Sequence, residues 1–272
     1  MSLKRFKKLL KKMLPLFILE EPGLLKGYDR RRLEKLKNKW KGKRCFIIGN
    51  GPSLNKLNLS KLADEYTFGV NGIFYKTDEV KTFRPYFYVV EDSAVMNDNL
   101  KRINSYDCKY KFFPSIFKKS IHNKKNVYFF NMNRGYYEKK SDYFEFPRFS
   151  PNSSKRLFCG QSVTLINLQL AYYFGFTEVY LIGMDFKYKI EDSAIIDDQK
   201  IISQEDDVNH FHPDYFGKGK TWHDPKLHNV LKSYELAKLI FEQDGRRIIN
   251  ATYGGELNLF DRKNYNSIFK NK

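Results

Sequence analysis

The sequence predicts an α/β fold, a Rossmann-like and mainly parallel sheet flanked by helices, preceded by an amphipathic N-terminal helix. From Lys43 onward, short strand-like runs alternate with helix-like runs, as in a parallel sheet with helical connections. The strand-like runs are apolar on both faces, as expected for strands covered on both sides. The 272 residues, 42% of them hydrophobic and 17% aromatic, suffice for one large core.

Seven short strands are expected, each followed by turn or cap residues. They span residues 44–49, 66–71, 86–92, 109–113, 126–131, 177–186 and 246–252. A helix is expected at 161–175, where Gly175 suits the C-terminal cap. Another is expected at 224–245, with Asp224 at the N-cap and Pro225 at the first helical position. A third, within residues 28–44, would be capped by Asp29 and lead into the first strand.

Residues 1–28 are expected to form a basic, membrane-associating segment. Apolar residues recur there at helical spacing, and basic residues fill the other face, which is typical of a helix lying in an anionic membrane surface. Packing on the domain or on a partner protein is the alternative. The apolar residues are Leu3, Phe6, Leu10, Met13, Leu14 and Phe17, and the basic ones are Lys4, Arg5, Lys7, Lys8, Lys11 and Lys12. The apolar run that ends at Leu19 is too short to span a bilayer, which takes about 20 residues.

The net charge of +18 is concentrated near the N-terminus. Residues 1–44 contain 16 Lys or Arg and 4 Asp or Glu, so the folded body is far less basic, which argues against nucleic acid as a partner. The three cysteines are widely spaced and form no disulfide or metal pattern, and no secretory signal is visible. We therefore expect a cytoplasmic protein, peripheral on the inner face of the bacterial plasma membrane.

Residues 29–272 are expected to form a single domain. Within it, residues 187–207 are polar and have little periodicity. Because they follow a strand that ends in candidate site residues, they predict, together with the stretch to residue 222, a lid or active-site loop. A disordered surface loop without function is the alternative interpretation.

Small and polar residues stand where the expected strands end. In open α/β sheets, ligands bind outside the carboxyl ends of the strands. Glycine lets backbone approach a ligand closely, asparagine suits sugar hydroxyls and base edges, and a helix start offers N–H groups to a phosphate. The candidate binding residues are Gly49, Asn50, Gly51, Pro52, Ser53, Asn71, Asp92, Gly160, Gln161, Ser162, Asp185, Asn250, Ala251 and Thr252. They predict a nucleotide or nucleotide-sugar pocket, although Asn-Gly pairs also form turns and Asp92 could simply cap a helix.

Four of the five histidines lie between residues 210 and 228. His210, His212 and His223 could together ligate a metal ion, but no zinc motif of the H-E-x-x-H kind is present, and we predict no metal site. A general base is the second interpretation, since histidine titrates near neutral pH. A loop of polar caps and packing aromatic residues is the third.

Four motifs together resemble a known family. "IIGNGPSL", "VNGIFY", "GFTEVYLIGMDF" and a histidine-bearing loop before a helix are similar, in this order, to the small bacterial sialyltransferases with a modified GT-A fold. They are at least as similar to the related domain typified by the archaeal 6-hydroxymethylpterin diphosphokinase. "NHFHPDYFGKGKTWHD" and "INATYGGELNLF" resemble that second branch more. The resemblance covers about residues 43–260.

The sialyltransferase resemblance implies an inverting glycosyltransferase. It would move an acidic, nonulosonic or sialic-type sugar from a CMP-sugar donor to a surface-glycan or glycolipid acceptor, with no cofactor required. His223, or as second choice His212, would deprotonate the acceptor hydroxyl. Those enzymes use two tyrosines to support the leaving phosphate. Here Lys187 and Tyr188 follow the "GMDF" strand, and lysine can neutralise a phosphate.

The same resemblance implies contacts to the donor. Asn50, with Gly49 and Gly51, would contact the nucleotide phosphate and sugar, and Asn71 the ribose or cytosine. Ser162 would face the donor, and residues 250–252 would border the base.

Two other functions stay open. Asp92 could bind a divalent cation such as Mg²⁺ together with phosphates, which suits an ATP-dependent, pterin diphosphokinase-like phosphotransferase. A non-catalytic nucleotide- or carbohydrate-binding module is the other. The sequence also leaves open the exact donor sugar, the acceptor, the linkage and the oligomeric state.

Overall fold

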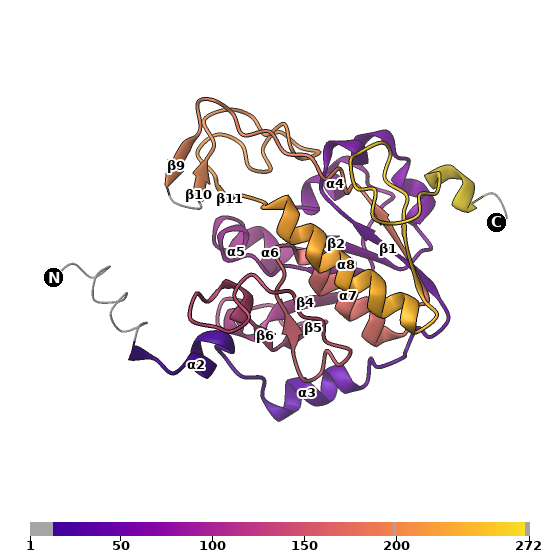
Figure 1. The fold of residues 1–272 in the computed structure, drawn as a ribbon. Helices are drawn as coiled ribbons and strands as arrows, with labels where there is room; N and C mark the ends of the chain where they lie inside the picture. The colour runs from indigo at the N-terminus through magenta and orange to yellow at the C-terminus, as the bar shows by residue number, and fades with distance from the viewer. Residues whose placement is uncertain (1–12, 198–199, 270–272) are drawn as a thin grey trace.

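The computed structural model describes residues 13–197 and 200–269 (Figure 1). At its centre is a seven-stranded sheet in the order β12-β8-β1-β2-β3-β4-β5, in which every neighbouring pair is parallel. This confirms the predicted Rossmann-like α/β fold. The strands are β1 (Arg44–Ile48), β2 (Thr67–Val70), β3 (Phe87–Val89), β4 (Tyr110–Pro114), β5 (Val127–Phe130), β8 (Glu178–Ile182) and β12 (Arg247–Asn250).

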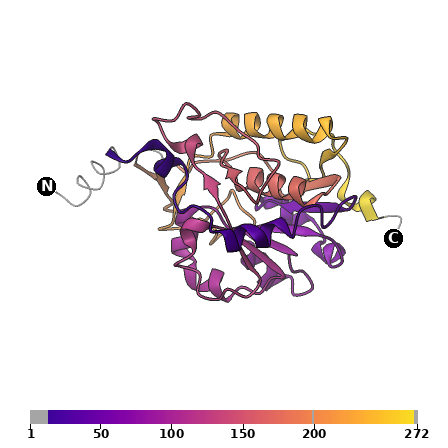
Figure 2. The same cartoon turned by 90° about the horizontal axis from the view of Figure 1, so that it is seen from below.

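Helices cover both faces of this sheet (Figure 2). Alternate residues of a strand point to opposite faces, and in β1 Cys45 and Ile47 join one core cluster while Phe46 and Ile48 join the other. The first cluster includes residues of α7 (Val163–Phe174), α8 (Leu227–Gln243) and α3 (Gly27–Glu34). The second includes residues of α4 (Phe74–Glu79), α5 (Ser93–Asp98) and α6 (Leu100–Ser105).

Two smaller sheets lie outside this frame. β9 (Ile195–Asp197), β10 (Lys200–Ile202) and β11 (Thr221–His223) pair antiparallel within the stretch predicted as a lid. β6 (Met132–Asn133) and β7 (Leu157–Phe158) form a short parallel pair. The lid stretch thus carries a small sheet, and its movement stays a prediction.

The described chain begins with an exposed apolar segment. Residues 1–12, most of the expected amphipathic helix, lie outside the described residues. α2 (Leu16–Glu20) follows, with Phe17 65% exposed. Asn131 and Asn133 each donate a hydrogen bond to Glu21, at 3.0 and 2.9 Å, and so tie α2 to the β6 segment. In residues 13–197 and 200–269, no helix is both long and apolar enough to cross a membrane.

Two predicted helix caps are wrong. α8 begins at Leu227 rather than at Asp224, and its N-cap is Lys226 in a left-handed conformation with φ of 41°. The Asp224 carboxylate instead accepts the Lys226 N–H in a turn before the helix, at 3.1 Å. α3 begins at Gly27, so Asp29 lies inside its first turn. There Asp29 is buried and pairs with Lys118 at 2.5 Å, which fixes α3 against the body.

Candidate functional site

A cavity of about 210 Å³ opens at the carboxyl ends of the central strands. Its wall includes residues that follow β1, β2, β3 and β8 within one or two positions. β8 lies on one side of β1 and β2 on the other, so the cavity lies at the point where the strand order reverses, the usual ligand position in open α/β sheets. We call it the first cavity. The start of α7 and the β11–α8 junction close its other side.

The loop after β1 is held tightly against the end of β8. A Cβ atom on Gly49 would come within 2.3 Å of the Gly183 carbonyl oxygen, and one on Gly51 within 1.9 Å of an Asp185 carboxylate oxygen. Ser53 donates to both oxygens of Asp185, from its N–H at 3.1 Å and from its hydroxyl at 2.7 Å. Asp185 therefore fixes this loop, and glycine is required where the two backbones approach each other.

Asn50 is directed into the site by Tyr215. The Asn50 amide nitrogen donates to the Tyr215 hydroxyl at 2.8 Å, and the Gly72 N–H donates to the same hydroxyl at 3.3 Å. Burial raises the pKa of Tyr215, so the phenol stays protonated. The amide oxygen of Asn50 is buried without a partner among the described residues and lines the first cavity. It is therefore positioned to accept a hydrogen bond from a ligand.

His210 and Asp207 form a buried hydrogen-bonded pair behind this network. Its ring stacks on Tyr215 at 4.2 Å between centroids, and its Nδ1 lies 2.7 Å from an Asp207 oxygen. Burial opposes ionisation of Asp207, but hydrogen bonds from His210 and from the Asn209 and Phe216 N–H groups outweigh it and lower the pKa of this carboxyl. His210 thus supports the wall that carries Tyr215.

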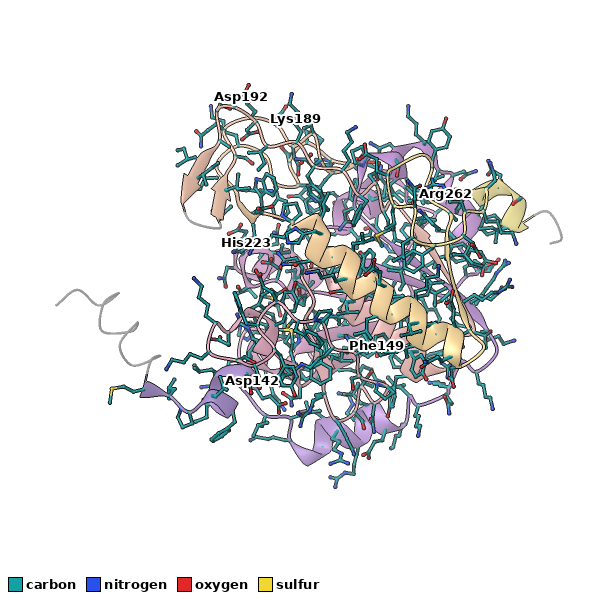
Figure 3. All side chains as sticks on the ribbon, viewed as in Figure 1. Asp142, Phe149, Lys189, Asp192, His223 and Arg262 are labelled. Carbon is teal, nitrogen blue, oxygen red and sulfur yellow. The ribbon has the colours of Figure 1, made fainter. Side chains whose placement is uncertain are left out.

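A second cavity, of about 360 Å³, adjoins the first. Residues lining both cavities form the wall between them: Glu91, Asp92, Gln161, His223 and Asp224. His223 ends β11 just before α8 (Figure 3), and its side chain is 43% exposed. Its Nδ1 lies 3.9 Å from an Asp92 carboxylate oxygen. The other oxygen of Asp92 accepts the Ala94 and Val95 N–H groups and caps α5.

The other predicted catalytic residues have different surroundings. His212 stacks on Tyr75 at 4.5 Å and is absent from the linings of both cavities. Tyr188 lines the first cavity and stacks on Trp222 at 6.2 Å, and desolvation raises the pKa of its phenol. Lys187 also lines it but is largely exposed and pairs with Glu256 at 2.8 Å.

The predicted binding residues divide into two groups. Gly49, Asn50, Gly51, Asn71, Asp92, Gln161, Ser162 and Asp185 line the first cavity, whereas Pro52, Ser53, Gly160, Asn250, Ala251 and Thr252 are not part of its lining. Asn250 is 1% exposed. Its side-chain nitrogen donates to the Leu257 carbonyl, and its side-chain oxygen accepts the Thr252 N–H. The Thr252 hydroxyl in turn accepts the Met184 N–H at 3.1 Å. Residues 250–252 therefore brace the end of β8 from behind.

Glu91 is a site residue that the sequence did not single out as a ligand. It lines both cavities, and burial together with the neighbouring Asp92 raises its pKa to about 7, against an opposing effect of Arg134. Tyr136 was likewise missed. An aromatic residue in a loop has no local pattern that separates a packing role from a site role, so only its three-dimensional neighbours reveal one.

The histidines do not converge on a metal site. Across the described ranges, no three His, Cys, Asp or Glu side chains are grouped as metal ligands would be. His210 pairs with Asp207, His212 stacks on Tyr75, and His223 faces Asp92. The three side chains that the sequence allowed as one ligand set thus have three separate environments.

The family follows from a comparison with family models. Residues 24–191 match the model described as 6-hydroxymethylpterin diphosphokinase MptE-like. The chain belongs to this family. The match confirms the resemblance carried by the "GNGPSL" and "GMDF" motifs, both of which lie within the matched residues. A comparison with curated proteins finds no match.

Among solved structures, this MptE-like chain is similar to sialyltransferases of Campylobacter jejuni. With CstII in complex with the substrate analogue CMP-3FNeuAc, the identity is 14% and the TM-score 0.42, over 81% of this chain and 85% of the other. With the monofunctional α-2,3-sialyltransferase Cst-I, the values are 17% and 0.41, over 77% and 75%. At such low identity, no residue role carries over from those enzymes to this chain.

Proposed function

We propose that the protein is a transferase that moves a group from a nucleotide-activated donor in the first cavity to a hydroxyl of an acceptor in the second, and that the donor is a CMP-activated acidic sugar. The observation that carries the proposal is the wall between the cavities, where His223 and Asp92 face both spaces. A base on such a wall reaches a donor on one side and an acceptor on the other.

The proposed step is an inverting displacement. His223 accepts the proton of the acceptor hydroxyl, and the hydroxyl oxygen forms a bond to the anomeric carbon. The bond from that carbon to the phosphate oxygen breaks, and CMP leaves with the electron pair. Asp92, 3.9 Å from the imidazole, stabilises the positive charge that His223 gains. Tyr188 lies on the donor side, where its phenol can donate a hydrogen bond to the leaving phosphate.

The charge of the first cavity favours a CMP-sugar over a nucleoside triphosphate. Its lining contains four carboxylates, those of Glu91, Asp92, Asp185 and Asp224, and one lysine, Lys187, which pairs with Glu256. A triphosphate needs several cations or a metal ion beside it. A CMP-activated acidic sugar carries one phosphodiester and one carboxylate, fewer negative charges than a triphosphate, and is held well by amides and backbone N–H groups, which the loops carrying Asn50 and Asn71 supply.

The second candidate is the diphosphokinase activity that the family description names, with ATP as the expected donor, and the family match favours it. Mg²⁺ would then be held by Asp92 with Glu91, the adjacent carboxylates at the end of β3, and would neutralise the phosphates. These residues fit the ion in part, because one Asp92 oxygen already caps α5. Both candidates place a hydroxyl acceptor beside His223.

We further propose that the protein acts at an anionic membrane surface, on the cytoplasmic side. This rests on the basic residues 1–12 and on the exposed apolar side chains of Met13, Leu14 and Phe17. A membrane position would bring the site to lipid-linked acceptors used in surface polysaccharide biosynthesis.

A donor panel tests the proposed function. The full-length protein is titrated with CMP-sialic acid, CMP-Kdo, UDP-sugars, and ATP with Mg²⁺ and 6-hydroxymethyl-dihydropterin, while binding and nucleotide release are measured. We expect a CMP-sugar to bind with a dissociation constant below 1 mM, which corresponds to a binding free energy of about −4 kcal/mol or stronger. We also expect CMP to be released slowly. Tight binding of UDP-sugars alone would contradict the CMP donor, and release of AMP with ATP and the pterin would establish the second candidate instead.

A further inference from the structure

Two residues that line the second cavity carry polar atoms that have no hydrogen-bond partner in the part of the chain that the structure describes. The Nε of Arg134 and the hydroxyl of Tyr136 are both buried without a hydrogen-bond partner among the described residues, and both residues line this cavity. Tyr136 is 2% exposed. Buried polar groups are nearly always paired, and an unpaired guanidinium N–H is costly to bury. Their position next to an open space indicates that a ligand supplies the missing acceptors.

The chemistry of the two groups defines the ligand. Arginine offers only donors, in a planar fork that matches an oxyanion, and a phenol hydroxyl donates a third hydrogen bond. Lys139 adds a positive charge to the same lining, whereas Lys226 is already paired with Glu145 at 2.7 Å. The carboxylates of Glu91, Asp92 and Asp224 belong to the wall shared with the first cavity, so an anionic group is expected at Arg134 and not at that wall. The apolar side chains of Ile116, Met132 and Phe144 complete the cavity and suit the carbon skeleton of a sugar or lipid.

The position of Arg134 is determined by the surrounding segment. It directly follows β6, and its N–H donates to the Glu20 carbonyl at 2.5 Å. Next to it, the Gly135 N–H donates to the Asn133 side chain at 3.0 Å, and Glu21 of the N-terminal region holds Asn133. The guanidinium is therefore carried by a braced backbone and not by a free loop.

We propose that the second cavity binds the acceptor through an anionic group, a carboxylate or a phosphate, held by Arg134 and Tyr136. This rests on the proposed function, since it takes His223 in the shared wall as the base. The acceptor then spans the cavity, with its oxyanion at Arg134 and its reacting hydroxyl at His223. The acceptor class is accordingly an acidic glycan or a phosphate-bearing sugar, and a neutral sugar is a poor acceptor.

Binding of small probes tests the site without the transfer reaction. The full-length protein is titrated by ligand-observed NMR with N-acetylneuraminic acid methyl glycoside, glucose 1-phosphate and the neutral methyl galactoside. The variants are Arg134→Gln, Arg134→Lys and Tyr136→Phe. Lys124→Gln, which removes an exposed cation outside both linings, is the matched control. CMP binding to each variant checks that the first cavity is intact.

At least one acidic probe is expected to bind, and the neutral glycoside at least 10-fold more weakly. Arg134→Gln is expected to weaken the acidic probe about 10-fold or more, with smaller losses for Arg134→Lys and Tyr136→Phe and none for Lys124→Gln. The preferred probe tells carboxylate from phosphate. Equal binding of the neutral probe, an unchanged affinity in Arg134→Gln, or no binding of any acidic probe would overturn the proposal. If the wild-type protein does not bind CMP, that result would instead contradict the proposed donor.

Discussion

His223 is the residue whose position links the proposed donor cavity to the proposed acceptor cavity. It ends β11, a strand of the small β9–β11 sheet, and faces Asp92 at the end of β3, so it lines both cavities, whereas His212 lines neither. The difference arises from the small antiparallel sheet, which carries His223 toward the strand ends and leaves His212 stacked on Tyr75.

Replacing His223 by Ala should slow transfer by about 100-fold to 10,000-fold, the usual contribution of a general base. Donor binding should change little, because the base acts on the acceptor hydroxyl. Steady-state rates and CMP affinity measure the two effects. His228→Ala is the control, since His228 is exposed and outside both linings. An equal loss in both variants would argue against His223 as the base.

Glu91 predicts a pH dependence of stability. Its pKa in the folded protein is about 7 against an ordinary 4.5, so the folded state binds more protons than the unfolded state between these values. Stability therefore falls as the pH rises through this window, by at most about 3 kcal/mol. Glu91→Gln removes the effect and should raise Tm at pH 8 more than at pH 5. Thermal melts at both pH values check this.

Glu235→Gln, on an exposed position of α8, is the control for the Glu91 variant and should shift Tm similarly at both pH values. If Glu91→Gln lowers Tm at pH 8, the ionised carboxylate must make stabilising contacts and the predicted sign is wrong.

At the scale of elements, the site is built by the contact between the ends of β1 and β8. The Gly49 N–H donates to the Ile182 carbonyl and the Gly51 N–H to the Gly183 carbonyl, which extends the parallel pairing into the loop. Ser53 then closes the loop on Asp185. This hydrogen-bonded turn carries the amide of Asn50. The loop is therefore held by backbone hydrogen bonds and, unlike a P-loop, contains no lysine to bind phosphate.

Gly51→Ala should disrupt this loop, because its Cβ would overlap an Asp185 oxygen. We expect weaker nucleotide binding, by about 10-fold or more, and a destabilisation of about 1–3 kcal/mol, the usual cost of overpacking. Gly27→Ala is the control, since a Cβ there meets no atom within 4 Å. Titration with CMP and thermal melts measure both effects. Unchanged CMP affinity in Gly51→Ala would mean that the loop does not touch the nucleotide.

For the whole molecule, the N-terminal region matters because it holds in place a segment that lines the second cavity. α2 exposes Phe17 while Glu20 and Glu21 hold the β6 segment that carries Arg134. In Figure 1, α2 lies on the same side of the molecule as the β9–β11 sheet. A membrane surface touching α2 would therefore lie near the proposed acceptor cavity.

Phe17→Glu should weaken binding to vesicles containing phosphatidylglycerol by about 10-fold, because it replaces a buried ring in the lipid interface by a charge repelled from it. Vesicle flotation measures the effect, and pure phosphatidylcholine vesicles should bind less in every case. Tyr253→Glu is the matched control, with 63% exposure against 65% for Phe17. An equal loss of vesicle binding in both variants would show that α2 is not the part of the protein that contacts the membrane.

Local sequence patterns predicted the fold and part of the site. The apolar runs specified all seven central strands to within a few residues, since burial on both faces leaves a continuous apolar pattern. Glycine and asparagine at the ends of β1 and β2 pointed to the first cavity. The helix caps failed at Asp29 and Asp224, where an ion pair and a turn took the carboxylates that the pattern assigned to helix starts.

Local patterns in the sequence were enough to predict the sheet, the edge of the sheet at which the first cavity opens, and the family. Only the tertiary structure decided that Asn250 braces a strand, that His223 rather than His212 reaches the cavity, and that Arg134 and Tyr136 face a second space. The difference arises from how far apart in the sequence the interacting residues are. Strand burial and turn chemistry are encoded within a few neighbouring residues, whereas cavity walls are assembled from side chains far apart in the chain, whose meeting depends on the packing of the whole molecule.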